Sequence, residues 1–114
     1  MSLPPLPLMH GTLDLLVLRT LAAGPAHGYG IATLVHTQTD GNLAIEDAAL
    51  YQALHRLDRQ GFVEAEWRQS ENNRRARYYT LTAEGRKRLR IEEANWRRYS
   101  EAVAAVLKGL CRAR

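Results

Sequence analysis

The sequence predicts a mainly α-helical protein with one small β-hairpin and a long C-terminal helix. Three observations lead to this fold class. Apolar residues recur with a helical period of 3.6 as far as residue 60, and the period changes to 2 over residues 63–81. A seven-residue apolar repeat then continues to the C-terminus without a proline. The order of three helices and a hairpin is that of a winged helix-turn-helix, and the last helix suits dimerisation.

The 114 residues fit one domain with an extension at each end. Three of the four prolines lie in residues 1–9, which predicts an extended N-terminal tail. We expect residues 10–81 to form the winged helix-turn-helix domain and residues 82–114 to form the dimerisation helix.

The first predicted helix is apolar on most of its sides. It starts after Gly11, with Thr12 as the predicted cap, and Gly24-Pro25 ends it. We therefore expect burial from two directions, against the domain core and against a partner. One apolar face holds Leu13, Leu16, Val17 and Leu21, and the other holds Leu15, Leu18 and Ala22.

The second predicted helix runs from about Gly28 to Gln38, and two of its faces compete for the core. The inward set is either Tyr29, Ala32 and Val35, or Ile31, Leu34 and Val35.

The third predicted helix has Asp47 as its N-cap, reaches Gln60, and is ended by Gly61. Alternation then predicts a strand over residues 63–67, with one face buried. The buried set is Val63, Ala65 and Trp67. Residues 68–75 are polar and predict a loop, and residues 77–81 predict the second strand.

The third helix is predicted to be apolar on one side and polar on the other. Leu50, Ala53, Leu54 and Leu57 form the apolar side. The polar side carries Ala48, Gln52, His55, Arg56 and Arg59, with Ala49 at its edge. Small residues permit close approach in a DNA major groove, and the longer side chains reach base edges or phosphates. A solvated surface helix shows similar charge, so this face alone does not decide the function.

The basic character of the chain is concentrated in residues 68–90, which hold eight Arg and Lys residues against two Glu. The polar loop in this segment includes Asn72, Asn73, Arg74 and Arg75, and Arg77 follows in the strand. A soluble hairpin tip has similar residues. Adjacent arginines and amides also suit a wing that contacts phosphates or enters a minor groove. A winged-helix fold places this loop beside the third helix, so together they favour double-stranded DNA as the partner.

The last predicted helix is capped by Thr82 and would be about 42 Å long for about 28 residues. That exceeds what so small a domain can cover, which predicts a homodimer. Its apolar seam consists of Leu89, Trp96, Val103 and Leu110, with Tyr99 and Val106 beside it.

Enzymatic activity, cofactors and metal binding are not expected. The four histidines, His10, His27, His36 and His55, have no metal-ligand spacing and no catalytic neighbours. His27 is expected to form a hydrogen bond at a helix start. The single Cys111 excludes an intrachain disulfide and fits a reducing compartment. No apolar run is long enough to span a bilayer and the N-terminus lacks a basic signal region, so we expect a cytoplasmic protein.

Three stretches closely resemble the PadR family of transcriptional regulators, over roughly residues 10 to 92. They are GTLDLLVLRTLAAGPAHGYGIA, ALYQALHRLDRQGFVEAEW and ENNRRARYYTLTAEG. The similarity is to the short subfamily, which has the winged domain and one dimerisation helix.

The resemblance implies that Tyr51 and its neighbours on the third helix, together with the loop arginines, contact a palindromic operator. It implies that the first and last helices form the homodimer. Many members repress genes for transport or detoxification and release DNA when a small aromatic compound binds, which makes Trp96 the candidate ligand-binding residue. An aromatic residue at helical spacing is more often part of a core, so packing of Trp96 in the dimer core is the favoured alternative. The family commonly has a hydroxyl residue before the Leu-Tyr pair and a proline after it, where this chain has Ala49 and Gln52. The target sequence therefore cannot be transferred from relatives.

The alternative is a winged-helix module that binds protein and has no specific DNA target. Such a module would not need the basic segment. The salt dependence of DNA binding separates the two functions.

Overall fold

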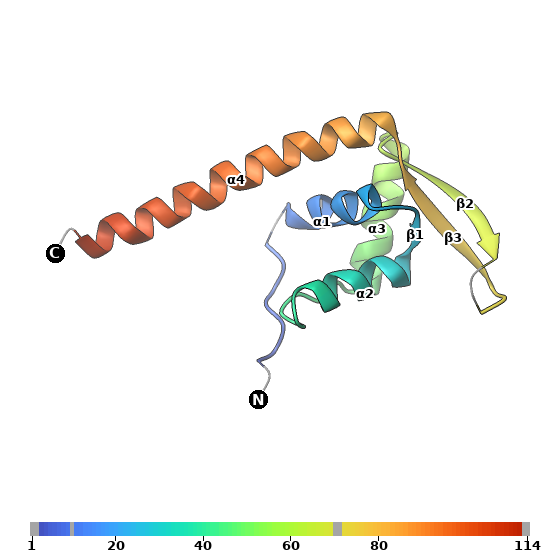
Figure 1. The fold of residues 1–114 in the computed structure, drawn as a ribbon, viewed down its shortest axis with the longest axis horizontal. Coiled ribbons are helices and arrows are strands. Elements are labelled where there is room, and N and C mark those ends of the chain that lie inside the picture. Colours follow the sequence, from blue (N-terminus) through green and yellow to red (C-terminus); the bar gives the residue numbers. More distant parts are fainter. Residues whose placement is uncertain (1–2, 10, 70–71, 113–114) are drawn as a thin grey trace.

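The computed structural model describes residues 3–9, 11–69 and 72–112, the last three of these through their backbone only. A cluster of helices packs beside a small sheet, and one long helix extends away from both (Figure 1). The elements in chain order are α1 (Thr12–Ala22), β1 (Ala26–His27), α2 (Gly28–Gln38), α3 (Asp47–Arg59), β2 (Val63–Gln69), β3 (Arg75–Leu81) and α4 (Ala83–Arg112). The predicted fold class is confirmed.

The core lies between α1, α2, α3 and the inner face of the sheet. Its largest fully buried side chains are Val17, Leu18, Leu21, Ile31, Leu50, Leu54, Leu57 and Val63. All four residues predicted for the apolar side of α3 are buried, so the helical period identified that face correctly. On α2, Ile31 and Val35 are buried whereas Tyr29 is 76% exposed, so the inward set containing Tyr29 was wrong. Leu34, from the other set, is also exposed.

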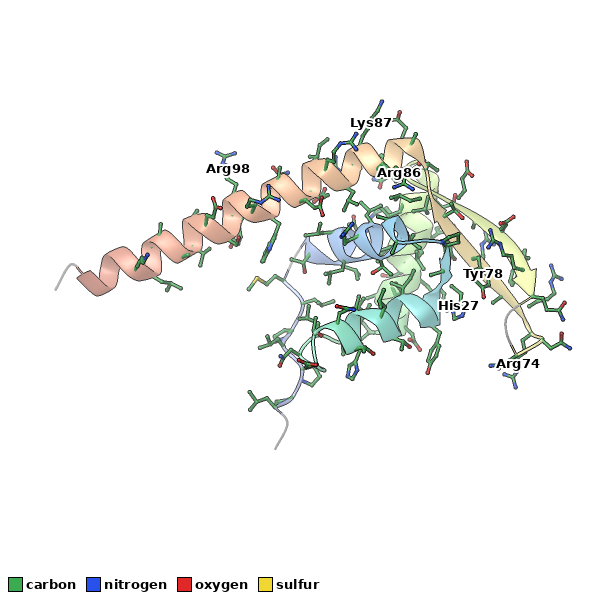
Figure 2. All side chains as sticks on the ribbon, viewed as in Figure 1. His27, Arg74, Tyr78, Arg86, Lys87 and Arg98 are labelled. Atoms are coloured by element: carbon green, nitrogen blue, oxygen red, sulfur yellow. The ribbon has the colours of Figure 1, made fainter. Side chains whose placement is uncertain are left out.

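The sheet has three antiparallel strands in the order β1-β3-β2. In the hairpin, Val63 pairs with Leu81 and Gln69 pairs with Arg75. The predicted loop over residues 68–75 is therefore too long, because its ends continue the two strands. The two-residue strand β1 was not predicted. It pairs His27 with Tyr78, whose rings meet edge to face at 5.1 Å (Figure 2).

Helix ends were predicted correctly in some places and one residue off in others. Gly61 adopts the left-handed conformation after α3 (φ 82°), as predicted. The Nδ1 atom of His27 accepts a hydrogen bond from the Gly30 amide at 3.0 Å, which confirms its role at a helix start. The N-cap of α1 is Gly11 (φ 88°), and the Thr12 hydroxyl instead donates backward to the carbonyl of Met9. The N-cap of α3 is Glu46, so Asp47 is already helical.

A tight joint connects the winged domain to α4. The Thr82 hydroxyl accepts a hydrogen bond from the Gly85 amide at 3.0 Å, which confirms its predicted capping role. The same hydroxyl donates to the Gly61 carbonyl at 2.7 Å, and the Thr82 amide donates to the Phe62 carbonyl at 3.1 Å. The start of α4 is thus bonded to the turn that follows α3.

Beyond the joint, α4 passes α1 and then leaves the domain (Figure 1). Leu89 is buried in the domain core. Residues 101–109 are all exposed, including the apolar Val103, Val106 and Leu107. The N-terminal segment runs extended along the loop before α3, and its Leu6 amide donates to the Asn42 carbonyl at 2.7 Å.

Candidate nucleic-acid interface

The face of α3 opposite the core is open to solvent. Tyr51 is half exposed, and the other exposed members of this face are Ala48, Gln52, His55 and Arg59. Ala48 lies in the first turn and Arg59 in the last, so small side chains come first and long donors follow. This order would permit the N-terminal end of α3 to approach the major groove of DNA most closely.

Arg56 does not belong to this open face. It is half-buried, and its guanidinium pairs with the carboxylate of Asp14 on α1. The helical angle placed Arg56 near Gln52, but a neighbouring helix supplies an acidic partner that the angle does not reveal. The pair gives Arg56 a role in holding α3 against α1, and its predicted contact with DNA stays a prediction.

Tyr51 lies against the start of α2. A Cβ atom added to Gly28 would lie 2.7 Å from the Tyr51 hydroxyl oxygen and 2.9 Å from its Cζ. A side chain at position 28 would require the Tyr51 ring to move, because real Cβ contacts are not so short. The backbone of α2 thus sets the position of the aromatic side chain on the open face of α3.

The wing carries its cations on an aromatic support. The Trp67 ring lies under two guanidinium groups, with its centre 5.2 Å from Cζ of Arg75 and 5.8 Å from Cζ of Arg77. Trp67 is 56% exposed, so its predicted burial in the core was wrong. Arg77 also approaches Asp58 on α3, with 3.9 Å between the charged atoms. The wing is thereby connected to α3.

At the tip, Asn72, Asn73 and Arg74 are exposed. Asn73 has a left-handed backbone (φ 62°), a conformation that asparagine tolerates better than most residues. The Gln69 side-chain amide donates to the Asn73 carbonyl at 3.3 Å. Arg74 projects from the tip of the wing (Figure 2).

The wing and α3 meet at an open groove of about 890 Å³. Tyr51 lines it from α3, Trp67, Arg74 and Arg75 line it from the hairpin, and Tyr29 and Thr33 line it from α2. The structure therefore brings together the two regions that the sequence predicted separately. The α2 contribution was missed, although the exposed alternative face of that helix was the available signal.

Burial raises the pKa of Tyr79 above its ordinary value of 10.0, and the nearby positive charge of Arg77 partly offsets this effect. Tyr79 lies on β3 at the base of the same groove. The Tyr79 hydroxyl is therefore neutral at physiological pH.

A second groove, of about 560 Å³, lies between α1 and α4. Trp96 and Tyr99 line it from α4, with 6.2 Å between their ring centres, and Met9, Thr12 and Leu15 line the other side. Glu92 and Asn95 supply its polar lining. Trp96 is 40% exposed there, so the candidate ligand residue does border a cavity.

The residues predicted for a dimer contact separate into two groups. Val17 and Leu89 are buried in the domain core and present no surface to a partner. Leu13 and Leu16 are partly buried, and Trp96, Tyr99, Val103 and Val106 are exposed. The side chain of Leu110, like that of Cys111, lies outside the described residues.

Within residues 3–9, 11–69 and 72–112, no helix has the length and apolarity that crossing a membrane requires. The same described residues contain no cluster of three or more His, Cys, Asp or Glu side chains suited to a metal ion.

The fold and the groove define a winged-helix protein of the DNA-binding class. Residues 17–91 match the family described as the PadR-like family of transcriptional regulators. The chain belongs to this family, so the identification from sequence motifs is confirmed.

Three solved structures show the similarity. A transcriptional regulator from Clostridium thermocellum is 27% identical with a TM-score of 0.76, covering 83% of this chain and 92% of that one. A PadR family transcriptional regulator from Eggerthella lenta is 35% identical with a TM-score of 0.71, covering 85% and 82%. A PadR family regulator from Clostridium difficile is 27% identical with a TM-score of 0.72, covering 85% and 99%.

Proposed function

We propose that this regulator is a homodimeric repressor that binds a palindromic operator and is released by a small aromatic ligand. The observation that carries the proposal is the groove at which Tyr51, on the open face of α3, meets the arginine-bearing wing. An α-helix of this kind fits the major groove of duplex DNA, and arginines on a hairpin fit the adjacent phosphates or minor groove.

In this arrangement Gln52 and His55 are the side chains best placed to read base edges. Both are exposed on α3, and neither forms a hydrogen bond with another described residue that would compete with DNA. The DNA sugar-phosphate backbone would be contacted by Tyr51, Arg59 and Arg74. Arg75 and Arg77 are held by Trp67, which reduces the entropy lost when they bind.

The DNA test uses a duplex that contains an inverted repeat from upstream of the gene, with half-sites about 34 Å apart. Gln52→Ala should relax base discrimination by about 1–3 kcal/mol, whereas Arg74→Ala should weaken all duplexes alike and flatten the salt dependence. Arg19→Ala, which removes an exposed cation on α1, is the matched control. If no duplex competes better than random DNA and Arg74→Ala leaves the salt slope unchanged, the protein-binding alternative is favoured.

The dimer is supported by the exposed apolar seam of α4. Val103, Val106 and Leu107 are 41%, 57% and 68% exposed, which is costly for an isolated helix in water. Val103→Glu should convert the dimer to a monomer and abolish tight operator binding, because one half-site gives only part of the contact. Ala105→Glu, on the opposite side of the helix, should leave the dimer intact. Sedimentation of both variants measures this, and a wild-type monomer at micromolar concentration would contradict the proposal.

Ligand release is supported by the Trp96 groove. An aromatic ring there can stack on Trp96 or Tyr99, and Glu92 and Asn95 offer acceptors for a donor group. Arg97 does not line this groove but a separate depression beside Arg19 and Glu93. We therefore expect neutral or cationic planar aromatics to bind better than phenolic acids.

The ligand test measures tryptophan quenching in a Trp67→Phe background, so that Trp96 alone reports. A planar aromatic cation should quench Trp96 and loosen operator binding, and Trp96→Ala should abolish the second effect while still allowing dimerisation. If no compound of either charge class changes both readouts, ligand control does not operate through this groove.

A further inference from the structure

One exposed side of α4, which runs from Arg97 beside the depression at α1 to Lys87 and Arg98 on the outer surface, carries a cluster of cations that the proposed operator contact does not use. At 100° per residue, these cations lie within an arc of about 120° around the helix axis. The cluster, named here the outer basic face, consists of Arg86, Lys87, Arg90, Arg97, Arg98 and Lys108. All six are exposed, and Glu101 is the one acidic residue within the same arc. Figure 2 shows Lys87 and Arg98 pointing away from α1, α2 and α3.

Most of these cations have no acidic partner within the described part of the chain. Lys87 lies 3.4 Å from Glu84, but the other five form no ion pair there. Arg88, by contrast, points to a different side of the helix and pairs with Glu92 at 2.8 Å. The outer basic face therefore presents net positive charge to solvent.

This charge pattern works against the stability of the helix. Arg86 and Arg90 are four residues apart on one face, where like charges repel by a few tenths of a kcal/mol. Arg86 and Lys87 also lie near the N-terminus of α4, where the helix dipole disfavours cations. A face selected only for solubility usually mixes both signs. The pattern thus favours an anionic partner.

The chemistry of the face indicates which anion. A protein interface needs an apolar centre with large side chains, whereas the apolar residues of this arc between Arg86 and Lys108 are three alanines, Ala94, Ala104 and Ala105. A duplex needs only regularly placed cations for its phosphates. From Arg86 to Lys108 the helix rises about 33 Å, which is close to the roughly 34 Å of one duplex turn.

We propose that the outer basic face of α4 binds the phosphate backbone of a second duplex segment, in addition to the operator bound through α3 and the wing. Arg74 lies at the far end of the molecule from Arg98 in Figure 2, so one duplex segment does not need to displace the other. This inference rests on the proposed function only for the identity of the first duplex. Its consequence is that the protein bridges the operator to neighbouring or distant DNA.

The experiment uses two duplexes with different fluorophores, the operator and a random sequence, and measures their co-diffusion in the presence of the full chain. With operator saturated, the wild type should bring the two duplexes together at low salt and lose this activity steeply as salt rises. The combined variant Arg86→Gln, Arg90→Gln and Arg97→Gln should weaken capture of the random duplex at least tenfold and leave operator affinity within twofold. Replacing the same three residues by Lys should restore capture, because the charge is kept.

Three results would overturn the inference. They are no co-diffusion with wild type at low salt, equal co-diffusion with the Gln variant, or preferential capture of polyglutamate over a duplex of equal charge. Failure of the proposed function looks different. In that case no sequence is preferred over random DNA, while the Gln variant still reduces total duplex binding.

Discussion

The guanidinium of Arg56 on α3 pairs with the carboxylate of Asp14 in the first turn of α1, across 42 residues of sequence. The pair is partly exposed, with side-chain exposures of 41% for Arg56 and 30% for Asp14. It joins the helix proposed to read DNA to the helix that lines the Trp96 groove through Thr12 and Leu15. The pair is therefore a direct contact between the two helices.

Breaking this pair should cost little stability but alter how α3 is held. Because solvent screens both groups, we expect Asp14→Ala and Arg56→Ala each to lower the free energy of unfolding by about 1 kcal/mol or less. The double variant should cost less than the sum of the two. Urea denaturation of the four proteins measures this coupling. Arg56→Ala should also weaken operator binding without changing base preference, and a changed preference would show that Arg56 leaves Asp14 to contact a base.

Gly28 should be required for the position of Tyr51. In Gly28→Ala the new methyl group would stand 2.7 Å from the Tyr51 hydroxyl oxygen, so the tyrosine must turn outward into the groove. We expect operator affinity to fall at least tenfold, with a much smaller effect on thermal stability because Tyr51 is already half exposed. Fluorescence anisotropy with an operator duplex measures the affinity.

The matched control for this prediction is the pair Gly28→Ala with Tyr51→Ala, in which no ring remains to collide. It should bind DNA as weakly as Tyr51→Ala alone and no worse. A Gly28→Ala protein with wild-type affinity would show that the contact with Tyr51 does not matter for binding.

Tyr79 should make the folded state less stable in alkali. Its pKa is raised by burial, whereas in the unfolded chain it ionises near 10. The stability that its neutral form contributes is complete below about pH 10 and is lost as pH rises through the folded pKa. Tyr79→Phe should remove this part of the alkaline loss, so its stability should decline less between pH 9 and about pH 11. Denaturation curves at several pH values test this, and parallel declines would assign the loss to other groups.

The buried side of α3 and the capping role of Thr82 could be predicted from the sequence, because a helical period and a capping hydroxyl are local signals. The sequence could not determine which aromatic residues are buried. Tyr29 and Trp67 are apolar enough for the core, but their rings lie at the groove, one on α2 and one under two arginines. The choice depends on what neighbouring elements leave uncovered.

Contacts between residues that are distant in the sequence could not be predicted from local sequence patterns either. The strand β1 has two residues and no period of its own, and it exists only because β3 offers an edge next to His27. In the sequence, Arg56 has the same pattern as the other residues on the polar side of α3. In the structure it differs from them because it pairs with Asp14 on α1. In both cases the deciding partner is distant in sequence.

The joint between the winged domain and α4 yields a prediction with an internal control, because α4 contains two glycines in opposite situations. A Cβ at Gly85 would lie 2.0 Å from the carbonyl oxygen of Phe62, a backbone atom that cannot turn aside. Gly85→Ala must therefore open the hydrogen-bonded joint at Thr82, and we expect a loss of about 3 kcal/mol, at the upper end for overpacking. At Gly109 a Cβ would meet nothing within 4 Å, so Gly109→Ala should raise helix stability by up to about 1 kcal/mol. Thermal denaturation of both variants measures the contrast. Because the joint sets the direction of α4 relative to α3, Gly85→Ala should also weaken operator binding under conditions in which the variant is fully folded. Equal melting temperatures for the two variants would show that the turn at Phe62 yields without cost and that the joint is not rigid.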